Sequence, residues 1–521
     1  QRQQGVEGYY DLEIARHLAR GDGLTFDGRH PTSGFQPLWV LLLAALYAPL
    51  ELLTASTPAM RLVVALLAQT LCVAAALAAL VRLLRRPIAR GGADASPWMA
   101  AVAVAVWLAI ESVYAMGVSG LEYALQTLIL ALLLARAARP DDPLDGARLR
   151  ALGWLGALAT LTRFDNALLI ALVGAHAAWT AGRRAADSGA RVGAVSRALL
   201  TIGLPSLLAL AGWSLVLWQT TGAPLPTSGT VKMAWSASRL AADPHVADGW
   251  LVAKLHHAAQ LLGAWPWPYR LGWWTGLVGG VALAIAWRDR PLGRALVPFA
   301  GFAIAQTLAY LIVFHGGYAF VPWYYPLMPL LAALAVTAAL AAVVERVRDR
   351  RIGRALAALL VVALALYALR AHALRGARAV AFAAQEPLRA AAAWTAAVGA
   401  PSLADGEAIG AWNAGLIAYL NPHAATRPVI NLDGLVNAPD FHADHRAAPC
   451  AYLARANIRL LVDVGWPATD DPAGPFAPYG ADLRACADRL VPAWTGPADP
   501  RQAGRRAVAY RVRPRAAEVA P

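Results

Sequence analysis

Charged residues are scarce in this chain of 521 residues. Asp, Glu, Lys and Arg make up 15% of it, whereas soluble domains carry about 25%. The charges are also segregated, because none falls between Leu62 and Val81 and none between Ala295 and Val344. About twenty apolar residues span the hydrocarbon core of a bilayer. The sequence therefore excludes a soluble globular protein and predicts a polytopic α-helical membrane protein surrounded by membrane lipids.

Lysine is nearly absent, since Lys232 and Lys254 are the only lysines among 46 basic residues. The arginines cluster in short segments between apolar runs, which is where the positive-inside rule places cytoplasmic loops. The net charge of +14 therefore does not indicate a nucleic-acid partner. These basic segments are Arg82–Arg90, Arg136–Arg150, Arg183–Arg197, Arg288–Arg294 and Arg346–Arg354.

Cysteine is rare as well, with three in the chain. Cys72 falls inside an apolar run and is interpreted as a small core residue. Cys450 and Cys486 lie in a polar C-terminal part, and we expect them to form a disulfide if that part faces an oxidising compartment. No spacing typical of metal ligands is evident, and His256 and His257 form a bare pair.

The chain divides into three parts. Residues 1–36 form a polar, aromatic-rich external loop, in which Tyr9–Ala19 has the spacing of an amphipathic helix on the membrane surface. Because this loop opens the chain, we expect a transmembrane helix to precede it. Residues 37–370 hold about nine to eleven transmembrane helices. Residues 386–521 predict a small extracytoplasmic α/β domain, with strand-like runs at 429–432, 458–464 and 507–512.

Successive loops should alternate between the two sides of the membrane, and this alternation fails near the start of the chain. Two full spans within 37–81 would place the first basic segment on the same side as the external loop. Either one of these two apolar runs is re-entrant, or 151–181 is one long span rather than a hairpin that turns at Arg163.

Two carboxylates stand out in the N-terminal segment. Glu7 and Asp11 are four residues apart and share a helical face, although like charges at this spacing are mildly destabilising. One interpretation is a general base that removes a proton from an acceptor hydroxyl, and the other is a solvated acidic face. Glu13 has Arg16 and His17 three and four residues on, which predicts a surface ion pair.

The motifs of this segment resemble the first external loop of GT-C-fold glycosyltransferases. The similarity is to the bacterial group related to protein mannosyltransferases and mycobacterial arabinofuranosyltransferases, and it covers most of the chain in order. Where such relatives tend to carry two adjacent acids, this chain has Val6 before Glu7. The matching motifs are Tyr9-Tyr10, Gly21-Asp22-Gly23, His30–Trp39, Ser119–Glu122, Thr162–Asn166, Leu225–Lys232, Asn413-Ala414-Gly415 and Asn431–Asn437.

The resemblance implies transfer of a sugar from a polyprenyl-phosphate donor to an acceptor hydroxyl of a glycan, lipid or protein. The reaction would invert the anomeric carbon and take place on the outer face of the bacterial inner membrane. Glu7 is the favoured base and Asp11 the alternative. No cofactor is assigned with certainty, and a divalent cation that bridges Glu7, Asp11 and phosphate is allowed.

The same resemblance makes Tyr10, His30, Glu122, Arg163 and Lys232 candidates for substrate binding. Arg163 lies between apolar runs, where an ionisable residue is a functional hypothesis by default, although Asp165 could simply neutralise it. His30 could cap or pack, Glu122 could meet a helix N-terminus, and Lys232 could be an ordinary loop lysine.

The aromatic groups later in the chain are interpreted as interfacial belts rather than sugar-stacking platforms. One group is Trp323-Tyr324-Tyr325, and the other is the tryptophan-rich run around Trp273.

Two other function classes fit the composition. A lipid-linked-oligosaccharide flippase would show inverted repeats and broken helices, and no repeat is evident in the sequence. A non-catalytic membrane assembly protein would tolerate a degenerate loop, which the exchange at Val6 favours slightly.

Overall fold

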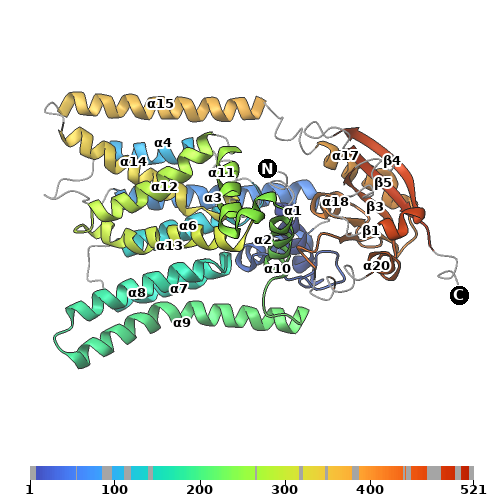
Figure 1. Cartoon of the computed structure of the whole chain (residues 1–521), viewed down its shortest axis with the longest axis horizontal. Coiled ribbons are helices and arrows are strands. Elements are labelled where there is room, and N and C mark those ends of the chain that lie inside the picture. Colours follow the sequence, from blue (N-terminus) through green and yellow to red (C-terminus); the bar gives the residue numbers. More distant parts are fainter. Residues whose placement is uncertain are drawn as a thin grey trace.

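The chain folds into a helical bundle with a C-terminal sheet domain at one end, as the computed structural model shows (Figure 1). The apolar side chains on the outside of the bundle are exposed, including Leu200, Leu207 and Leu208 at 61–63%. Such a surface is stable in lipid rather than in water. The structure describes residues 7–53, 56–84, 97–110, 119–138, 145–264, 267–315, 321–346, 350–377, 386–437, 441, 448–465, 483–498 and 506–514.

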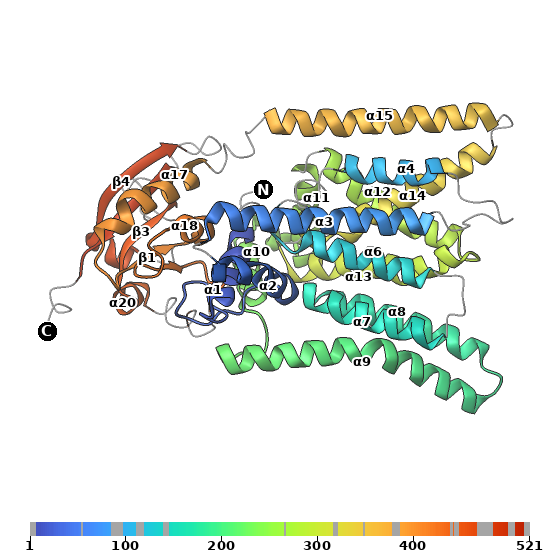
Figure 2. The ribbon, with the colours of Figure 1, turned by 180° about the vertical axis from the view of Figure 1, so that it is seen from behind.

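Long apolar helices run along the bundle axis (Figures 1 and 2). Among the described residues, α3, α9 and α13 are long and apolar enough to cross a membrane, and five further apolar helices are shorter. The chain is therefore a polytopic helical membrane protein. The bundle helices are α3 (Pro58–Leu84), α4 (Pro97–Ala109), α6 (Tyr123–Ala137), α7 (Gly146–Thr162), α8 (Asn166–Arg184), α9 (Ser188–Thr221), α12 (Trp267–Ala286), α13 (Pro291–Val313), α14 (Leu327–Arg346) and α15 (Arg350–Ala377).

The apolar run 151–181 is a hairpin and not a single span. Arg163 has extended backbone angles (φ −160°, ψ 131°) and ends α7, and α8 begins three residues later. Gly156 on α7 lies against Ile170 on α8, so residues equally far from the turn meet. The hairpin interpretation is therefore correct, and the single-span alternative is wrong.

The apolar helix α2 (Pro37–Leu53) begins and ends at the same end of the bundle. Near its start, the indole of Trp39 donates to the carbonyl of Gly120. Just after its end, the carbonyl of Pro58 accepts from Tyr419 of the sheet domain. This favours the interpretation in which one of the first two apolar runs does not cross the membrane.

The described parts of the basic segments lie at the end of the bundle away from the sheet domain. Figure 1 shows the α8–α9 connection, the end of α14 and the start of α15 at this far end. Arg82 and Arg136 lie in the last turns of α3 and α6, which run in the same direction as α8. The alternation of loops that failed in the sequence is regular once α2 is confined to one end.

The sheet domain has five strands in the order β2-β1-β3-β5-β4. β1 pairs in parallel with β2 and β3, and β5 pairs antiparallel with β3 and β4. The strands are β1 (Ala408–Ala411), β2 (Val429–Asn431), β3 (Ile458–Gly465), β4 (Leu490–Ala498) and β5 (Arg506–Val512). The α-helices of the domain are α17 (Glu386–Trp394), α18 (Ala414–Leu420) and α20 (Pro449–Arg455). The domain also has a π-helical turn at Thr395–Gly399 and 3-10 turns at Ala400–Ser402 and Leu483–Arg489.

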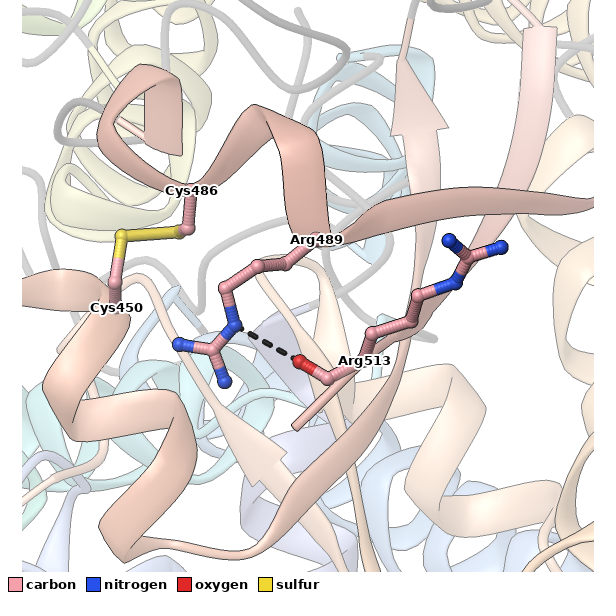
Figure 3. Close-up of a disulfide and its surroundings, with 4 residues drawn as sticks. All are labelled: Cys450, Cys486, Arg489 and Arg513. Carbon is pink, nitrogen blue, oxygen red and sulfur yellow. Dashed lines mark hydrogen bonds between the residues drawn. A yellow bond between two sulfur atoms is a disulfide. The ribbon is translucent and has the colours of Figure 1, made fainter. Parts of the chain in front are cut away.

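A disulfide joins Cys450 of α20 to Cys486, with the Cα atoms 5.9 Å apart (Figure 3). The predicted pairing is confirmed. Close by, Arg489 Nε donates to the carbonyl of Arg513 at 2.8 Å, which ties the start of β4 to the end of β5. Cys72 is buried and unpaired in α3, as its place in an apolar run predicts.

The N-terminal helix α1 (Glu7–Arg20) contains the predicted helix but does not lie on an open membrane surface. Leu12 and Ile14 are fully buried at 1% and 0% exposure. The ring of Tyr9 packs on that of Tyr419 in α18, with centroids 5.2 Å apart. The helix lies between the bundle and the sheet domain because its polar residues also find partners there.

Candidate active site

A cavity of about 410 Å³ lies where α1, the bundle and the sheet domain meet. Its wall combines carboxylates, cations and phenol groups with apolar side chains. Among the residues that line it are Tyr10, Asp11, Gly34, Glu122, Arg163, Asp165, Ser228, Lys232, Tyr310, Trp323, Tyr324 and Leu435.

One wall of the cavity forms where three distant segments meet. Ser33 Oγ lies 3.2 Å from Thr227 Oγ1, at the start of α10 (Thr227–Ala241). Thr227 in turn donates to the carbonyl of Asn437 at 2.8 Å. Gly34 packs directly on Leu435, and a Cβ at this position would lie 1.6 Å from the Leu435 carbonyl oxygen. Only glycine allows this approach.

Arg163 lies at the centre of a buried network. Its guanidinium donates to Glu122 Oε1 at 2.8 Å and to Asp165 Oδ1 at 3.2 Å. It also donates to the hydroxyl of Tyr310 at 3.1 Å and lies over the ring of Tyr324, 4.5 Å from its centroid. Two carboxylates surround this cation, so its charge is compensated inside the fold.

Lys232 reaches the same wall from α10. Its Nζ donates to the hydroxyl of Tyr324 at 3.1 Å. Gln306 of α13 bonds both Asp165 Oδ2 and the carbonyl of Tyr324, each at 2.9 Å. These contacts connect Lys232 to the Arg163 network through one tyrosine.

Tyr10 is held on the opposite side by the sheet domain. Its hydroxyl lies 3.0 Å from Asp433 Oδ2 and accepts from Asn431 Nδ2 at 3.0 Å. Asp433 also accepts from the backbone N–H of Leu435 at 2.8 Å. The phenol ring is therefore fixed at the edge of the cavity.

The structure brings five of the seven predicted site residues to this cavity, namely Tyr10, Asp11, Glu122, Arg163 and Lys232. Helix α1 begins at Glu7, but the side chain of Glu7 is outside the described part of the structure.

His30 is not among the residues that line the cavity. Its side chain is 66% exposed and its Nδ1 lies 2.6 Å from Asp27 Oδ2. Burial alone raises the pKa of Asp27, but its hydrogen bonds to His30 and Arg29 and the charge of His30 outweigh burial and lower that pKa. His30 therefore makes a hydrogen bond within its own loop, and its role in substrate binding stays a prediction.

Glu122 pairs with Arg163 rather than capping a helix. It is the N-cap residue of α6, yet its side chain makes no capping hydrogen bond. At 2% exposure it lies inside the fold. Its carboxylate therefore organises Arg163.

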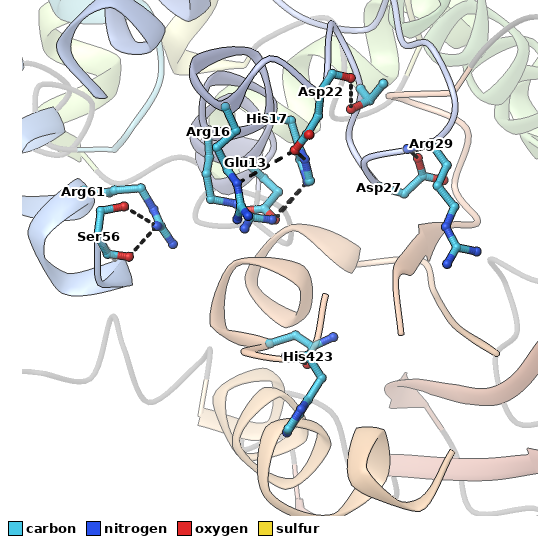
Figure 4. Close-up of polar contacts among 12 residues, drawn as sticks. Glu13, Arg16, His17, Asp22, Asp27, Arg29, Ser56, Arg61 and His423 are labelled. Carbon is cyan, nitrogen blue, oxygen red and sulfur yellow. Dashed lines mark hydrogen bonds and ion pairs between the residues drawn. The ribbon is translucent and has the colours of Figure 1, made fainter. Parts of the chain in front are cut away.

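Glu13 forms the predicted ion pair with Arg16, but the pair is buried rather than on the surface. Arg16 and His17 both approach Glu13 Oε1, and Figure 4 shows the three side chains together. His17 Nδ1 lies 3.0 Å from Asp22 Oδ2 on its other side. Burial alone raises the pKa of Glu13, but Arg16 and His17 outweigh it and lower that pKa to about 2. The sequence shows the pairing, but not the sheet domain that covers it.

The segment Trp323–Tyr325 is buried, not an interfacial belt. The three side chains are 5%, 5% and 2% exposed, and Trp323 and Tyr324 line the cavity. The belt interpretation is wrong here, because hydropathy does not distinguish an aromatic at the lipid boundary from one that lines a cavity. Of the other group, Trp273 is buried and Trp274 is 44% exposed.

A separate cluster of potential metal ligands lies beside the cavity wall. Among the described residues, Asp243, His257 and His315 are the one group whose ligand atoms come together, all within 4.8 Å of one another. The structure thus contains a candidate site for a divalent cation. The bare His256-His257 pair gave no sign of it, because its two partners come from other elements.

No known protein family and no curated protein matches the sequence. Solved structures do match. ArnT from Cupriavidus metallidurans, in a crystal structure bound to undecaprenyl phosphate, is similar with a TM-score of 0.51 and 16% identity, over 99% of this chain and 94% of that one. The chain has the GT-C fold. The fold expected from the sequence motifs is thereby confirmed.

The oligosaccharyltransferase of Archaeoglobus fulgidus is also similar. Its complex with zinc and sulfate matches with a TM-score of 0.47 and 13% identity, over 88% of this chain and 64% of that one. Its complex with an inhibitory peptide and a dolichol-phosphate matches with a TM-score of 0.46 and 12% identity, over 88% and 66%. The chain therefore spans about two thirds of the length of the archaeal protein. A specific relation to protein mannosyltransferases or arabinofuranosyltransferases stays a prediction.

Proposed function

We propose that this protein transfers a sugar from a polyprenyl-phosphate donor to an acceptor hydroxyl on a glycan, lipid or protein. The observation that carries the proposal is the cavity that Asp11, Arg163 and Lys232 line together. Glycosyl transfer needs a carboxylate near the attacking hydroxyl and positive charge near the departing phosphate. The GT-C fold adds support, because the ArnT structure with this fold holds undecaprenyl phosphate.

Asp11 is the proposed general base. It is 5% exposed and lines the cavity, one turn along α1 from Glu7, the base that the sequence favoured. As the acceptor oxygen bonds to the anomeric carbon, the carboxylate takes the hydroxyl proton. The bond between that carbon and the phosphate oxygen breaks with its electron pair on oxygen, which inverts the configuration and releases polyprenyl phosphate.

Lys232 is the proposed partner of the departing phosphate. Arg163 already has two carboxylates within 3.2 Å, so much of its charge is compensated within the protein. Lys232 lines the cavity, where its Nζ donates to the Tyr324 hydroxyl at 3.1 Å and lies 5.5 Å from the centroid of the Tyr324 ring. The place of Lys232 in the cavity wall supports this role, because the departing phosphate needs a positive charge nearby. Arg163 contacts Tyr310 and Tyr324 and is proposed to position both beside Lys232.

The active site is proposed to face the periplasm of a bacterial inner membrane. The described parts of the basic segments lie at the far end of the bundle, which the positive-inside rule assigns to the cytoplasm. The disulfide between Cys450 and Cys486 fits an oxidising compartment on the opposite side. The proposed parts are an external catalytic loop (1–36), a transmembrane part (37–370) and a periplasmic domain (386–521).

The test separates chemistry from binding. Purified protein is incubated with a panel of undecaprenyl-phosphate-linked hexoses and pentoses, and release of undecaprenyl phosphate is followed with membrane extract as the source of acceptors. Asp11→Asn keeps the shape of the side chain, so turnover should fall by about 10²–10⁴-fold, as when a general base is lost. Binding of undecaprenyl phosphate, measured by native mass spectrometry, should be unchanged.

Lys232→Gln should give the opposite result, with undecaprenyl phosphate binding weaker by about 10- to 150-fold, since a charge-assisted hydrogen bond contributes roughly 1.5–3 kcal/mol. Lys232→Arg should restore part of it. Asp405→Asn is the control for Asp11, because its carboxylate is 74% exposed and pairs with Arg427 far from the cavity. Full turnover in both Asp11→Asn and Glu7→Gln would refute the proposed mechanism.

A further inference from the structure

The candidate metal cluster joins three elements beside the cavity. Asp243 follows the end of α10 and precedes the 3-10 turn Pro244–Asp248. His257 is on α11 (Trp250–Ala264), and His315 follows the end of α13 by two residues. Their ligand atoms lie within 4.8 Å of one another. Residues up to 72 positions apart in the chain therefore present two imidazoles and a carboxylate at one point.

Two imidazole nitrogens in this cluster are buried without a hydrogen-bond partner. They are His257 Nε2 and His315 Nδ1. His315 is only 3% exposed, and its other nitrogen, Nε2, lies 3.0 Å from Asp243 Oδ2. The two rings are adjacent, with centroids 4.5 Å apart. Buried polar atoms nearly always have a hydrogen-bond partner or a metal ion beside them. Two such nitrogens without a partner in one cluster therefore indicate that the site binds an ion.

The surroundings hold the ligands in place. Asp243 Oδ1 accepts from the backbone N–H of His245 at 2.9 Å, which leaves Oδ2 directed at His315. The backbone N–H of His315 donates to Ser236 Oγ of α10. Such supporting hydrogen bonds orient the ligands of metal sites.

We propose that Asp243, His257 and His315 bind a Zn²⁺ ion that fastens α10 and α11 to the end of α13. Two imidazoles and one carboxylate form a donor set typical of zinc, whereas Mg²⁺ and Ca²⁺ prefer oxygen ligands. Two cations lie near the cluster, Arg239 and Lys254. Lys254 donates to the carbonyl of Phe314 at 2.8 Å. These positive charges repel any divalent cation, so the ligands themselves must supply the affinity.

The ion would stabilise the cavity wall without taking part in the chemistry. α10 carries Lys232, and the last turns of α13 carry Tyr310, which bonds Arg163. Phe314, directly before His315, also lines the cavity. Zinc bound here fixes the distance between Lys232 and the Arg163 network. This positioning role rests on the proposed function, whereas metal binding itself does not.

The test measures bound metal directly. Protein carrying an affinity tag without histidine is purified in detergent, stripped with EDTA, incubated with ZnCl₂ and desalted, and its metal content is measured by mass spectrometry. The wild type should hold about one Zn²⁺ per chain, given three protein ligands in one site. His257→Gln and Asp243→Asn should each lose most of it.

The control is His256→Gln, the neighbouring histidine on α11. His256 contacts Gln260 and the ring of His245, not the cluster, so its zinc content should equal that of the wild type. Elution of each variant as a single species in gel filtration shows that the variants fold. Zinc should also raise the thermal unfolding midpoint of the wild type and of His256→Gln, and leave that of His257→Gln unchanged.

Three results would overturn the proposal. One is a wild type without zinc after incubation with ZnCl₂, and another is equal zinc in His257→Gln, Asp243→Asn and the wild type. The third is binding of Mg²⁺ but not of Zn²⁺ when the stripped protein is incubated with either chloride. None of these measurements uses a sugar donor, so their failure leaves the proposed transfer reaction untouched. Conversely, an inactive panel of donors would not change the zinc content.

Discussion

Arg163 donates to Glu122 across 2.8 Å, and this one contact joins the turn between α7 and α8 to the first residue before α6. Both side chains are nearly buried, at 8% and 3% exposure. A buried ion pair adds little net stability, but the loss of one partner leaves an uncompensated charge. The contact therefore fixes geometry at the floor of the cavity.

Arg163→Met should lower the free energy of unfolding by about 3–5 kcal/mol, because Glu122 and Asp165 then remain buried without their cation. Glu122→Gln should cost less, about 1–2 kcal/mol, since the amide oxygen still accepts from Arg163 and Asp165 still compensates its charge. The double variant should cost clearly less than the sum of the two. Thermal unfolding in a fixed concentration of detergent measures all three, and costs that add within about 0.5 kcal/mol would show that the residues are not coupled.

The disulfide predicts the state of the thiols. Under denaturing, non-reducing conditions the wild type should expose one free thiol, Cys72, and three after reduction. Closing the loop between Cys450 and Cys486 should contribute about 3–4 kcal/mol in the chain-entropy account.

A reductant should therefore lower the unfolding midpoint of the wild type and of Cys72→Ser. It should not change that of the double variant Cys450→Ser, Cys486→Ser. An equal effect of reductant on all three proteins would contradict the pairing.

The lowered pKa of Glu13 predicts how the free energy of unfolding depends on pH. Its pKa is lowered to about 2 in the folded chain, against an ordinary value of 4.5. The carboxylate therefore contributes stability that is present above pH 4.5 and is lost as the pH falls toward 2. This difference in pKa between the unfolded and the folded chain corresponds to roughly 3 kcal/mol in the free energy of unfolding.

Glu13→Gln should unfold more readily than the wild type at pH 7, because Arg16 loses its partner. The decline of its unfolding midpoint between pH 5 and pH 3 should be shallower than that of the wild type. Asp405→Asn is the control, since this exposed carboxylate should leave the acid limb unchanged. Parallel acid limbs in Glu13→Gln and the wild type would show that Glu13 does not titrate with folding.

Local sequence predicted much of the fold, because apolar runs and turn residues act at short range. The strand-like runs at 429–432, 458–464 and 507–512 correspond to β2, β3 and β5. β1 was missed, since its four residues, Ala408–Ala411, have no alternating pattern. β4 was missed because it contains Pro492 and Pro497, which are unusual inside strands.

The sequence predicted those residues of the candidate site that lie in recognisable motifs, and it missed the others. The motifs around Tyr10, Glu122, Arg163 and Lys232 do meet at one cavity, although they are spread over more than 200 residues. Tyr310 and Gln306 were not found, because a polar residue in a long apolar helix gives no sign of the charge it faces. The histidine cluster was missed for a related reason, since each of its ligands comes from a different element.

The sidedness of the site gives the last prediction. Cysteines introduced at Ala241, Asp405 and Arg191 provide three exposed positions. Ala241 is the last residue of α10, the helix that carries Lys232, and Asp405 lies in the sheet domain. Arg191 lies near the start of α9, at the α8–α9 end of the bundle. A membrane-impermeant maleimide added to intact spheroplasts should label Ala241→Cys and Asp405→Cys. It should label Arg191→Cys only after the membrane is permeabilised, because the arginine-rich ends are assigned to the cytoplasm. The Cys72→Ser background removes the one free thiol among the described residues.

Labelling of Ala241→Cys and Asp405→Cys from opposite sides would contradict the shared cavity itself. Labelling of Arg191→Cys alone in intact spheroplasts would leave the cavity intact and reverse its orientation, so the donor would be drawn from the cytoplasmic leaflet.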